Sequence, residues 1–304
     1  MRKLGLLSLA ALFVLVGCGG DEGPEPEVTT GVLTRITFTG GSQPQWSPDG
    51  GRILYCLDNR IYTITPTGAD SLKIATITDG TAMHPHWNPA DPTQICFINR
   101  NQSGDDDLWE IQTMTIGEEP VVVYSGIKQL SSVSFTRDGS EIAFTKDAGS
   151  TAGVFLIAAE GGAEYAWPRE DGWGWVQDAE CALDSDLISF VERKTGTAYN
   201  FFTLSREGGT AERLSNFGTE DDLTQAARSF DGNRYCIRWG KHFYWTEFNL
   251  YFINSTGGGF EQLTLMKTFD PNNPAWSPDG SMVVFNRQTI SGEPSDLFVV
   301  DLSL

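Results

Sequence analysis

The sequence repeats one stretch, QPQWSPDG at residues 43–50, and this repeat decides the fold. It returns almost unchanged as NPAWSPDG at 273–280, and weaker copies are HPHWNP at 84–89 and SVSFTRDG at 132–139. Two eroded copies are DAEC at 178–181 and QAARSFDG at 225–232. The positions aligned with Trp46 are spaced by 41, 48, 46, 47 and 48 residues. Six copies with a period of about 46 residues indicate a repeat architecture.

Each copy has the same internal order. A short strand ends at the aromatic position and a Ser-Pro-Asp-Gly turn follows, in which Pro pre-sets φ, Asp bonds backbone amides and Gly takes a positive φ. A second strand comes next, and a third carries an apolar–aromatic pair in all six copies: Ile61-Tyr62, Leu108-Trp109, Val154-Phe155, Phe201-Phe202, Leu250-Tyr251 and Leu297-Phe298. A fourth strand follows a Gly-rich turn. Four antiparallel strands, radially repeated, predict an all-β, six-bladed β-propeller.

The two ends of the repeat region predict how the ring closes. The third strand of the sixth copy runs almost to Leu304, while Arg35-Ile36-Thr37 matches the fourth-strand pattern and precedes the first copy. We expect this N-terminal strand to complete the last blade, because blade six would otherwise present an unpaired edge.

These residues carry a family resemblance. The Pro-x-Trp-Ser-Pro-Asp-Gly repeats, over residues 32–304, resemble the WD40-like repeats of the TolB-type six-bladed propeller. The resemblance implies a propeller that acts in the cell envelope, and we expect no counterpart of the N-terminal α/β domain of that family. A repeat of this kind specifies architecture and leaves function open.

The N-terminal segment has the pattern of a lipoprotein signal. Met1-Arg2-Lys3 is basic, and the apolar run from Leu4 to Val16 is short for a membrane-spanning helix. It ends at Cys18 in a stretch, LVGC, that resembles a bacterial lipobox, so we expect a signal peptide at 1–17 and acylation of Cys18. An ordinary secretory signal is the alternative. Residues 18–31 are predicted to be a disordered tether before the propeller at 32–304.

Composition limits the partners. The net charge is −19, and it becomes −21 once Arg2 and Lys3 leave with the signal. So acidic a chain is a poor match for nucleic acid or for anionic lipid heads. We expect a monomer, attached to the membrane through its acyl chains, on the periplasmic side of the outer membrane or at the cell surface.

Strand order predicts a ring of polar side chains at one mouth of the channel. The position three before each aromatic is polar in all six copies: Gln43, His84, Ser132, Asp178, Gln225 and Asn273. His86 and Glu180 lie two residues further along their strands and face the same side. These eight residues are the candidate binding residues, although side chains that merely hydrate the channel would give the same pattern.

Two aromatic-rich loops are predicted to reach this mouth from adjacent blades. They contribute Trp167, Trp173 and Trp175 from one loop and Trp239 and Trp245 from the other. Exposed aromatics beside polar groups suit protein contacts or stacking on sugars. Packing of the loops against each other is the alternative. The acidic loop 104–107 also belongs to this face; a structural Ca²⁺ there is conceivable, but the spaced ligands of a calcium loop are missing.

The remaining motifs leave three hypotheses. No Gly-x-Ser-x-Gly elbow and no phosphate-binding loop occur, so we predict no catalytic residues, no metal and no cofactor. We read the cysteines after Cys18 as buried thiols. The leading hypothesis is a non-catalytic docking module for an envelope protein or peptide. A glycan or small-ligand receptor is the second, and a lyase or hydrolase using His84, His86, Asp178 and Glu180 is the third.

Overall fold

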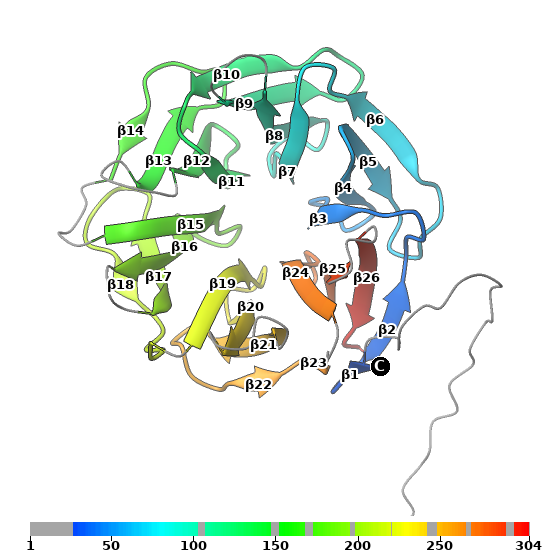
Figure 1. Ribbon diagram of the computed structural model, residues 1–304, viewed down its shortest axis with the longest axis vertical. Coiled ribbons are helices and arrows are strands. Elements are labelled where there is room, and N and C mark those ends of the chain that lie inside the picture. The colour runs from blue at the N-terminus through cyan, green and yellow to red at the C-terminus, as the bar shows by residue number, and fades with distance from the viewer. Residues whose placement is uncertain are drawn as a thin grey trace, which may run out of the picture.

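The protein is a six-bladed β-propeller (Figure 1). The computed structural model describes residues 27–102, 107–146, 152–167, 173–194, 198–219, 221–241, 248–265, 269–289 and 295–303. No helix occurs within these ranges, and therefore none there could cross a membrane. The predicted fold class, with four antiparallel strands in each blade, is confirmed.

Each blade runs from an innermost strand at the channel to an outermost strand at the rim. Blades one to three are β3 (Ser42–Trp46), β4 (Ile53–Leu57), β5 (Arg60–Ile64), β6 (Leu72–Thr76); β7 (Thr81–Trp87), β8 (Gln94–Asn101), β9 (Leu108–Thr115), β10 (Val121–Gly126); and β11 (Leu130–Phe135), β12 (Glu141–Lys146), β13 (Gly153–Ala158), β14 (Tyr165–Ala166). Blades four to six are β15 (Trp173–Cys181), β16 (Leu187–Lys194), β17 (Tyr199–Ser205), β18 (Glu212–Arg213); β19 (Asp221–Arg228), β20 (Arg234–Lys241), β21 (Asn249–Asn254), β22 (Glu261–Gln262); and β24 (Phe269–Trp276), β25 (Met282–Thr289), β26 (Asp296–Asp301), β2 (Val32–Arg35).

The Ser-Pro-Asp-Gly turn owes its shape to its own side chains. Asp49 Oδ1 accepts hydrogen bonds from Ser47 Oγ at 2.6 Å and from Gly51 N at 2.9 Å. These bonds lower the pKa of Asp49, and Gly50 takes φ 71°. The Ser229–Asp231 and Ser277–Asp279 pairs repeat the arrangement at 2.6 Å. We call the side of the ring that carries these turns the turn face. The opposite side, where the inner strands begin and successive blades connect, is the mouth face.

The hydrophobic core lies between blades, in six separate clusters. One cluster packs Cys96 and Ile98 of blade two against Phe135 and Phe144 of blade three. Each of the other five likewise joins one pair of neighbouring blades. Because a blade buries its two faces only against its neighbours, the ring is stable only when all six are in place.

The N-terminal strand closes the ring as predicted. β2 pairs with β26 in antiparallel register, with Val32 opposite Asp301 and Arg35 opposite Phe298. One feature differs from the sequence prediction: residues 27–31, assigned there to the disordered tether, are ordered. β1 (Glu27–Val28) pairs with β23 (Thr264–Leu265), and Thr29 N donates to Leu263 O at 2.9 Å. The reason is that the backbone beyond β22 offers free pairing groups, which sequence composition does not reveal.

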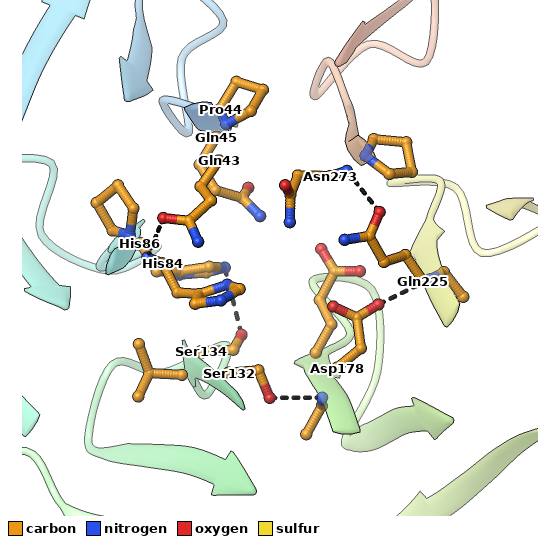
Figure 2. A pocket seen from close by; sticks show the side chains of 16 residues that line it. Gln43, Pro44, Gln45, His84, His86, Ser132, Ser134, Asp178, Gln225 and Asn273 are labelled. Carbon is orange, nitrogen blue, oxygen red and sulfur yellow. Dashed lines mark hydrogen bonds between the residues drawn. The ribbon is translucent and has the colours of Figure 1, made fainter. Parts of the chain in front are cut away.

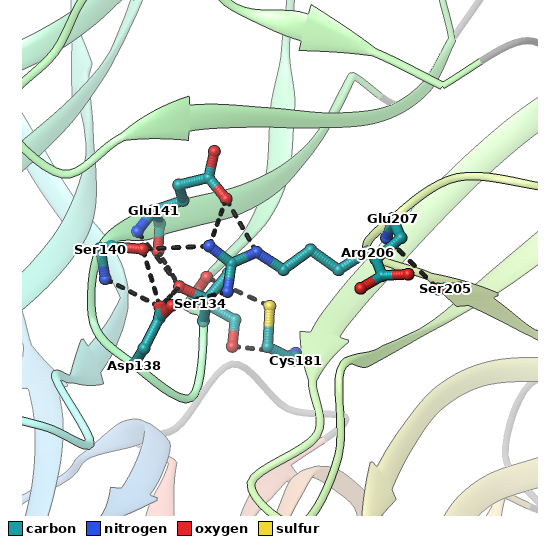
Figure 3. Close-up of polar contacts among 9 residues, drawn as sticks. Ser134, Asp138, Ser140, Glu141, Cys181, Ser205, Arg206 and Glu207 are labelled. Carbon is teal, nitrogen blue, oxygen red and sulfur yellow. Dashed lines mark hydrogen bonds and ion pairs between the residues drawn. The ribbon is translucent and has the colours of Figure 1, made fainter.

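Arg206 ties blade four to blade three on the turn face (Figure 3). Its guanidinium donates to Glu141 Oε2 at 2.8 Å, to Asp138 Oδ2 at 2.8 Å and to Ser140 Oγ at 3.0 Å. The Arg206 bond holds the pKa of Asp138 well below its usual value. One guanidinium thus joins two blades through three side chains.

We expect Arg206→Met to lower the free energy of unfolding by about 1 kcal/mol at pH 7, because the network is partly exposed. Since the folded-state pKa of Asp138 is depressed, this contribution is present above the unfolded pKa and shrinks as pH falls below about 4. Urea unfolding at pH 7 and pH 3 measures both values. Arg60→Met, which breaks an exposed pair with Asp58 at 3.5 Å, is the control. An equal loss in both variants would contradict the inter-blade role.

Candidate functional site

A β-bulge interrupts every inner strand near the mouth of the channel. The register with the second strand shifts in every blade, between Ser42/Gln45, Met83/His86, Leu130/Val133, Gln177/Glu180, Leu223/Gln225 and Asn272/Ala275, and blade four has a further shift between Trp173/Trp175. Four residues at these bulges have positive φ: Gln43 at 54°, His84 at 49°, Asp178 at 59° and Asn273 at 52°. Such backbone is uncommon for residues other than glycine, and bulges with it re-aim side chains near functional sites.

The bulges direct the predicted ring into a single pocket (Figure 2). The pocket contains about 500 Å³ of open space, solvent at its mouth included. All eight candidate residues line it, together with Gln45: Gln43, His84, His86, Ser132, Asp178, Glu180, Gln225 and Asn273. The sequence alone placed these residues at the mouth, but it gave no sign of the bulges that turn them inward.

The ring side chains bind the backbone of the next blade. Gln43 Oε1 accepts from His84 N at 2.9 Å, and Gln225 Oε1 accepts from Asn273 N at 2.6 Å. In the same way Ser132 Oγ accepts from Ala179 N and Asp178 Oδ2 accepts from Ala226 N, both at 2.7 Å. The donating amides of His84, Ala179 and Asn273 lie within the bulges of their strands. The ring therefore fixes the blades to one another while it lines the pocket.

A second layer of contacts lies deeper in the channel. His86 Nε2 is 3.3 Å from Ser134 Oγ, which accepts from Cys181 N at 3.0 Å. Glu180 Oε2 accepts from Arg228 N at 3.2 Å. These bonds follow the same direction around the ring, so the inner strands are locked at two levels.

Burial sets the protonation of the pocket. It lowers the pKa of His84 and of His86 to about 4, so both imidazoles are neutral at pH 7. It raises the pKa of Asp178 to about 7 and that of Glu180 to about 8, with the Asp178 charge adding to the second shift. No Lys or Arg is among the lining residues. Near neutral pH the pocket is thus polar, and both carboxyls are partly protonated because their raised pKa values lie close to that pH.

The histidine pair and the acidic pair lie on separate blades. His84 and His86 belong to β7, Asp178 and Glu180 belong to β15, and β11 of blade three stands between them. Among the described residues, no three His, Cys, Asp or Glu side chains gather as a metal site would require. The acidic loop 104–107 falls outside them except for Asp107, which pairs with Arg100. The four cysteines after Cys18 are free and buried, as predicted.

The aromatic loops differ from the sequence prediction. Trp167 is not a surface anchor: it is buried between blades three and four and its Nε1 donates to Ser205 O at 3.2 Å. Trp239 packs edge-on against Tyr251 and Phe260, with ring centroids 5.2 Å away in each case. Both rings fill gaps where outer strands are short. Trp175 is 43% exposed, while Trp245 and the side chain of Trp173 lie outside the described residues.

Sequence reasoning missed a second pocket, on the turn face. It contains about 580 Å³ of open space and shares Gln45, His86 and Glu180 with the mouth pocket. Its rim carries the residues two positions after the repeat aromatics, including Pro48, Pro89, Leu183, Phe230 and Pro278. The apolar character of this position in five of the six copies was the available signal; the third copy has Arg137 there.

Comparison with known proteins adds to this geometry. No family model and no curated protein matches the sequence. Among solved structures, a protein assigned as TolB from Agrobacterium tumefaciens superposes with a TM-score of 0.67 at 15% identity, covering 92% of this chain and 100% of that one. The chain has the TolB propeller fold.

Other solved structures with different names share this fold. TolB from Acinetobacter baumannii gives a TM-score of 0.65 at 16% identity; 84% of this chain is covered, and the chain spans only 64% of that protein. An oligogalacturonate lyase in complex with manganese gives 0.62 at 14% identity, covering 86% of this chain and 77% of that one. At such identities the likeness to TolB and to the lyase shows the fold alone.

Proposed function

We propose that the protein is a non-catalytic docking module of the bacterial cell envelope, anchored through an acylated Cys18, that binds a protein or peptide segment in the mouth pocket. The observation that carries this proposal is the pocket itself, whose polar ring is fixed by hydrogen bonds between blades. A ring held in this way loses little conformational freedom on binding.

The chemistry of the lining suits a polypeptide. Gln43, Gln45, Gln225 and Asn273 bring side-chain amides to the pocket. An amide offers both a donor and an acceptor, which is what the N–H and C=O groups of a peptide backbone require.

The two alternatives have less support. A glycan receptor needs aromatic rings beneath the sugar, and among the described residues that line the mouth pocket there is no Trp, Tyr or Phe. A lyase or hydrolase needs its acid–base groups to converge, whereas β7 and β15 hold the two pairs on blades that are not adjacent. Calorimetry with envelope oligosaccharides tests the glycan alternative directly.

We expect Gln45→Trp to weaken partner binding, because Gln45 lines both pockets and a large ring at this position occupies the space where they meet. The immobilised wild-type chain and the variant are compared for retention of proteins from an envelope extract, and each retained protein is then purified and titrated. Loss of affinity of at least roughly tenfold is expected, equivalent to about 1.4 kcal/mol.

Glu207→Trp is the matched control, since it adds the same ring to an exposed turn of blade four. It should bind like the wild type. Equal recovery of every protein by the wild type and Gln45→Trp would rule out docking in the mouth pocket.

A further inference from the structure

Four of the eleven exposed large apolar side chains in the described part of the chain lie on the mouth face. Phe38 is 72% exposed and Ile127 is 68% exposed, the two highest values among large apolar residues of the described chain. Leu265 and Trp175 are 44% and 43% exposed. Scattered apolar residues are ordinary on a protein surface, but four that share one face are a feature to explain.

Chain topology places all four on the mouth face. Phe38 lies between the end of β2 and the start of β3, and Ile127 lies between β10 and β11. Leu265 ends β23 just before the connection to β24, and Trp175 is near the start of β15. Each of these inner strands begins on the mouth face. The four side chains therefore surround the mouth at four different blade junctions.

The N-terminal part of the chain arrives at this same face. β22 runs from the turn face toward the mouth face, and β23 continues in that direction. β1 is antiparallel to β23, with Glu27 opposite Leu265. The 26 residues that precede β1 therefore join the propeller beside one of the four exposed apolar side chains.

The length of this segment limits how far the mouth can lie from an anchor at Cys18. Residues 18 and 27 are nine positions apart, and an extended chain advances at most ~3.6 Å per residue. The mouth face is then held within roughly 30 Å of the acyl chains. The turn face lies on the opposite side of the ring.

We propose that the mouth-face rim, defined as Phe38, Ile127, Trp175 and Leu265, contacts the surface of a lipid bilayer and turns the channel mouth toward the membrane. Apolar and Trp side chains on one face insert into the interface between headgroups and acyl chains. The net charge of −19 favours zwitterionic over anionic lipid. A partner that docks in the mouth pocket then approaches along the membrane surface. This last statement rests on the function proposed above.

The experiment places a fluorescent label on either face of the full chain. The four cysteines after Cys18 are free and buried, so Ile127→Cys and Phe230→Cys can each be labelled selectively. Phe230 is the matched control, because it is an exposed apolar residue (39%) on the turn face. Each labelled protein is mixed with phosphatidylcholine vesicles that carry nitroxide-labelled lipid.

We expect quenching at position 127 to exceed quenching at position 230 at least threefold. Adding Phe38→Ser and Leu265→Ser to the Ile127→Cys protein should reduce that excess to less than half. Equal quenching at the two positions, or none at either, overturns the proposal and leaves the rim as a protein-binding surface. Gln45→Trp should leave the quenching unchanged even where it prevents partner retention, so the two proposals fail independently.

Discussion

Asp296→Ala is expected to lower the free energy of unfolding by about 3–5 kcal/mol, a large share of the ~5–15 kcal/mol of a typical domain. Asp296 is 4% exposed and accepts from Arg35 Nη2 at 2.6 Å, Thr37 Oγ1 at 3.2 Å and Gly40 N at 3.1 Å. All three donors belong to the N-terminal segment that closes the ring. Alanine would remove the buried carboxylate that these three donors share.

Urea unfolding followed by tryptophan fluorescence measures this loss. The double variant Asp296→Ala/Arg35→Met should lose less than the sum of the two single variants, because the Arg35–Asp296 pair is then counted once. Asp58→Ala, at an exposed carboxylate, is the control and should change stability little. A loss no larger than that of the control would show that ring closure does not depend on this contact.

The double variant Asp178→Asn/Glu180→Gln is expected to be more stable than the wild type at pH 8, by roughly 2–4 kcal/mol. The folded protein raises the pKa of these carboxyls to about 7 and about 8. Their stabilising contribution is therefore present below the unfolded pKa of about 4 and is lost as pH rises through the folded values. Amide oxygens can still accept from Ala226 N and Arg228 N.

Urea unfolding from pH 4 to pH 8 checks this expectation, and the gain should vanish near pH 4. Asp231→Asn is the control, and its effect on stability should have the opposite sign. Hydrogen bonds from Ser229 and Asn233 lower the pKa of Asp231, whereas the pKa values of Asp178 and Glu180 are raised. That variant should lose stability at neutral pH. A flat difference across the pH range for the double variant would show that the two carboxyls are ionised in the folded state.

At acid pH the histidines change the free energy of unfolding in the direction opposite to that of the two carboxyls. Their pKa is lowered to about 4 in the folded protein, so the unfolded chain binds protons first as pH falls below about 6.5. Stability is consequently lost between about pH 6.5 and pH 4 on their account. Between about pH 4 and pH 6.5 the acid pair and the histidine pair therefore change the stability of the protein in opposite directions and offset each other, whereas above about pH 6.5 only the loss from the acid pair remains.

Much of the site could be placed from the sequence because each position of a repeat protein occurs several times, and a residue type that recurs at one position is informative. Gln43 alone predicts nothing, but a polar residue at the same offset in six copies predicts a ring. The aromatic loops had no such support. Trp167 and Trp239 occur once each, and a single tryptophan is equally consistent with an exposed anchor and with the core. Trp167 is buried in the core, and Trp239 is partly buried against Tyr251 and Phe260.

The sequence by itself determined the six-bladed ring, its closure by the N-terminal strand and the ring of polar residues at the mouth, because each depends on local turn chemistry and on period. Only the tertiary structure decided the bulges, the hydrogen bonds between blades, the raised pKa of Asp178 and the placement of Phe38 and Ile127 on one face. These features arise where neighbouring blades meet. Burial and partner geometry there are set by residues about 46 positions apart, and no local pattern encodes them.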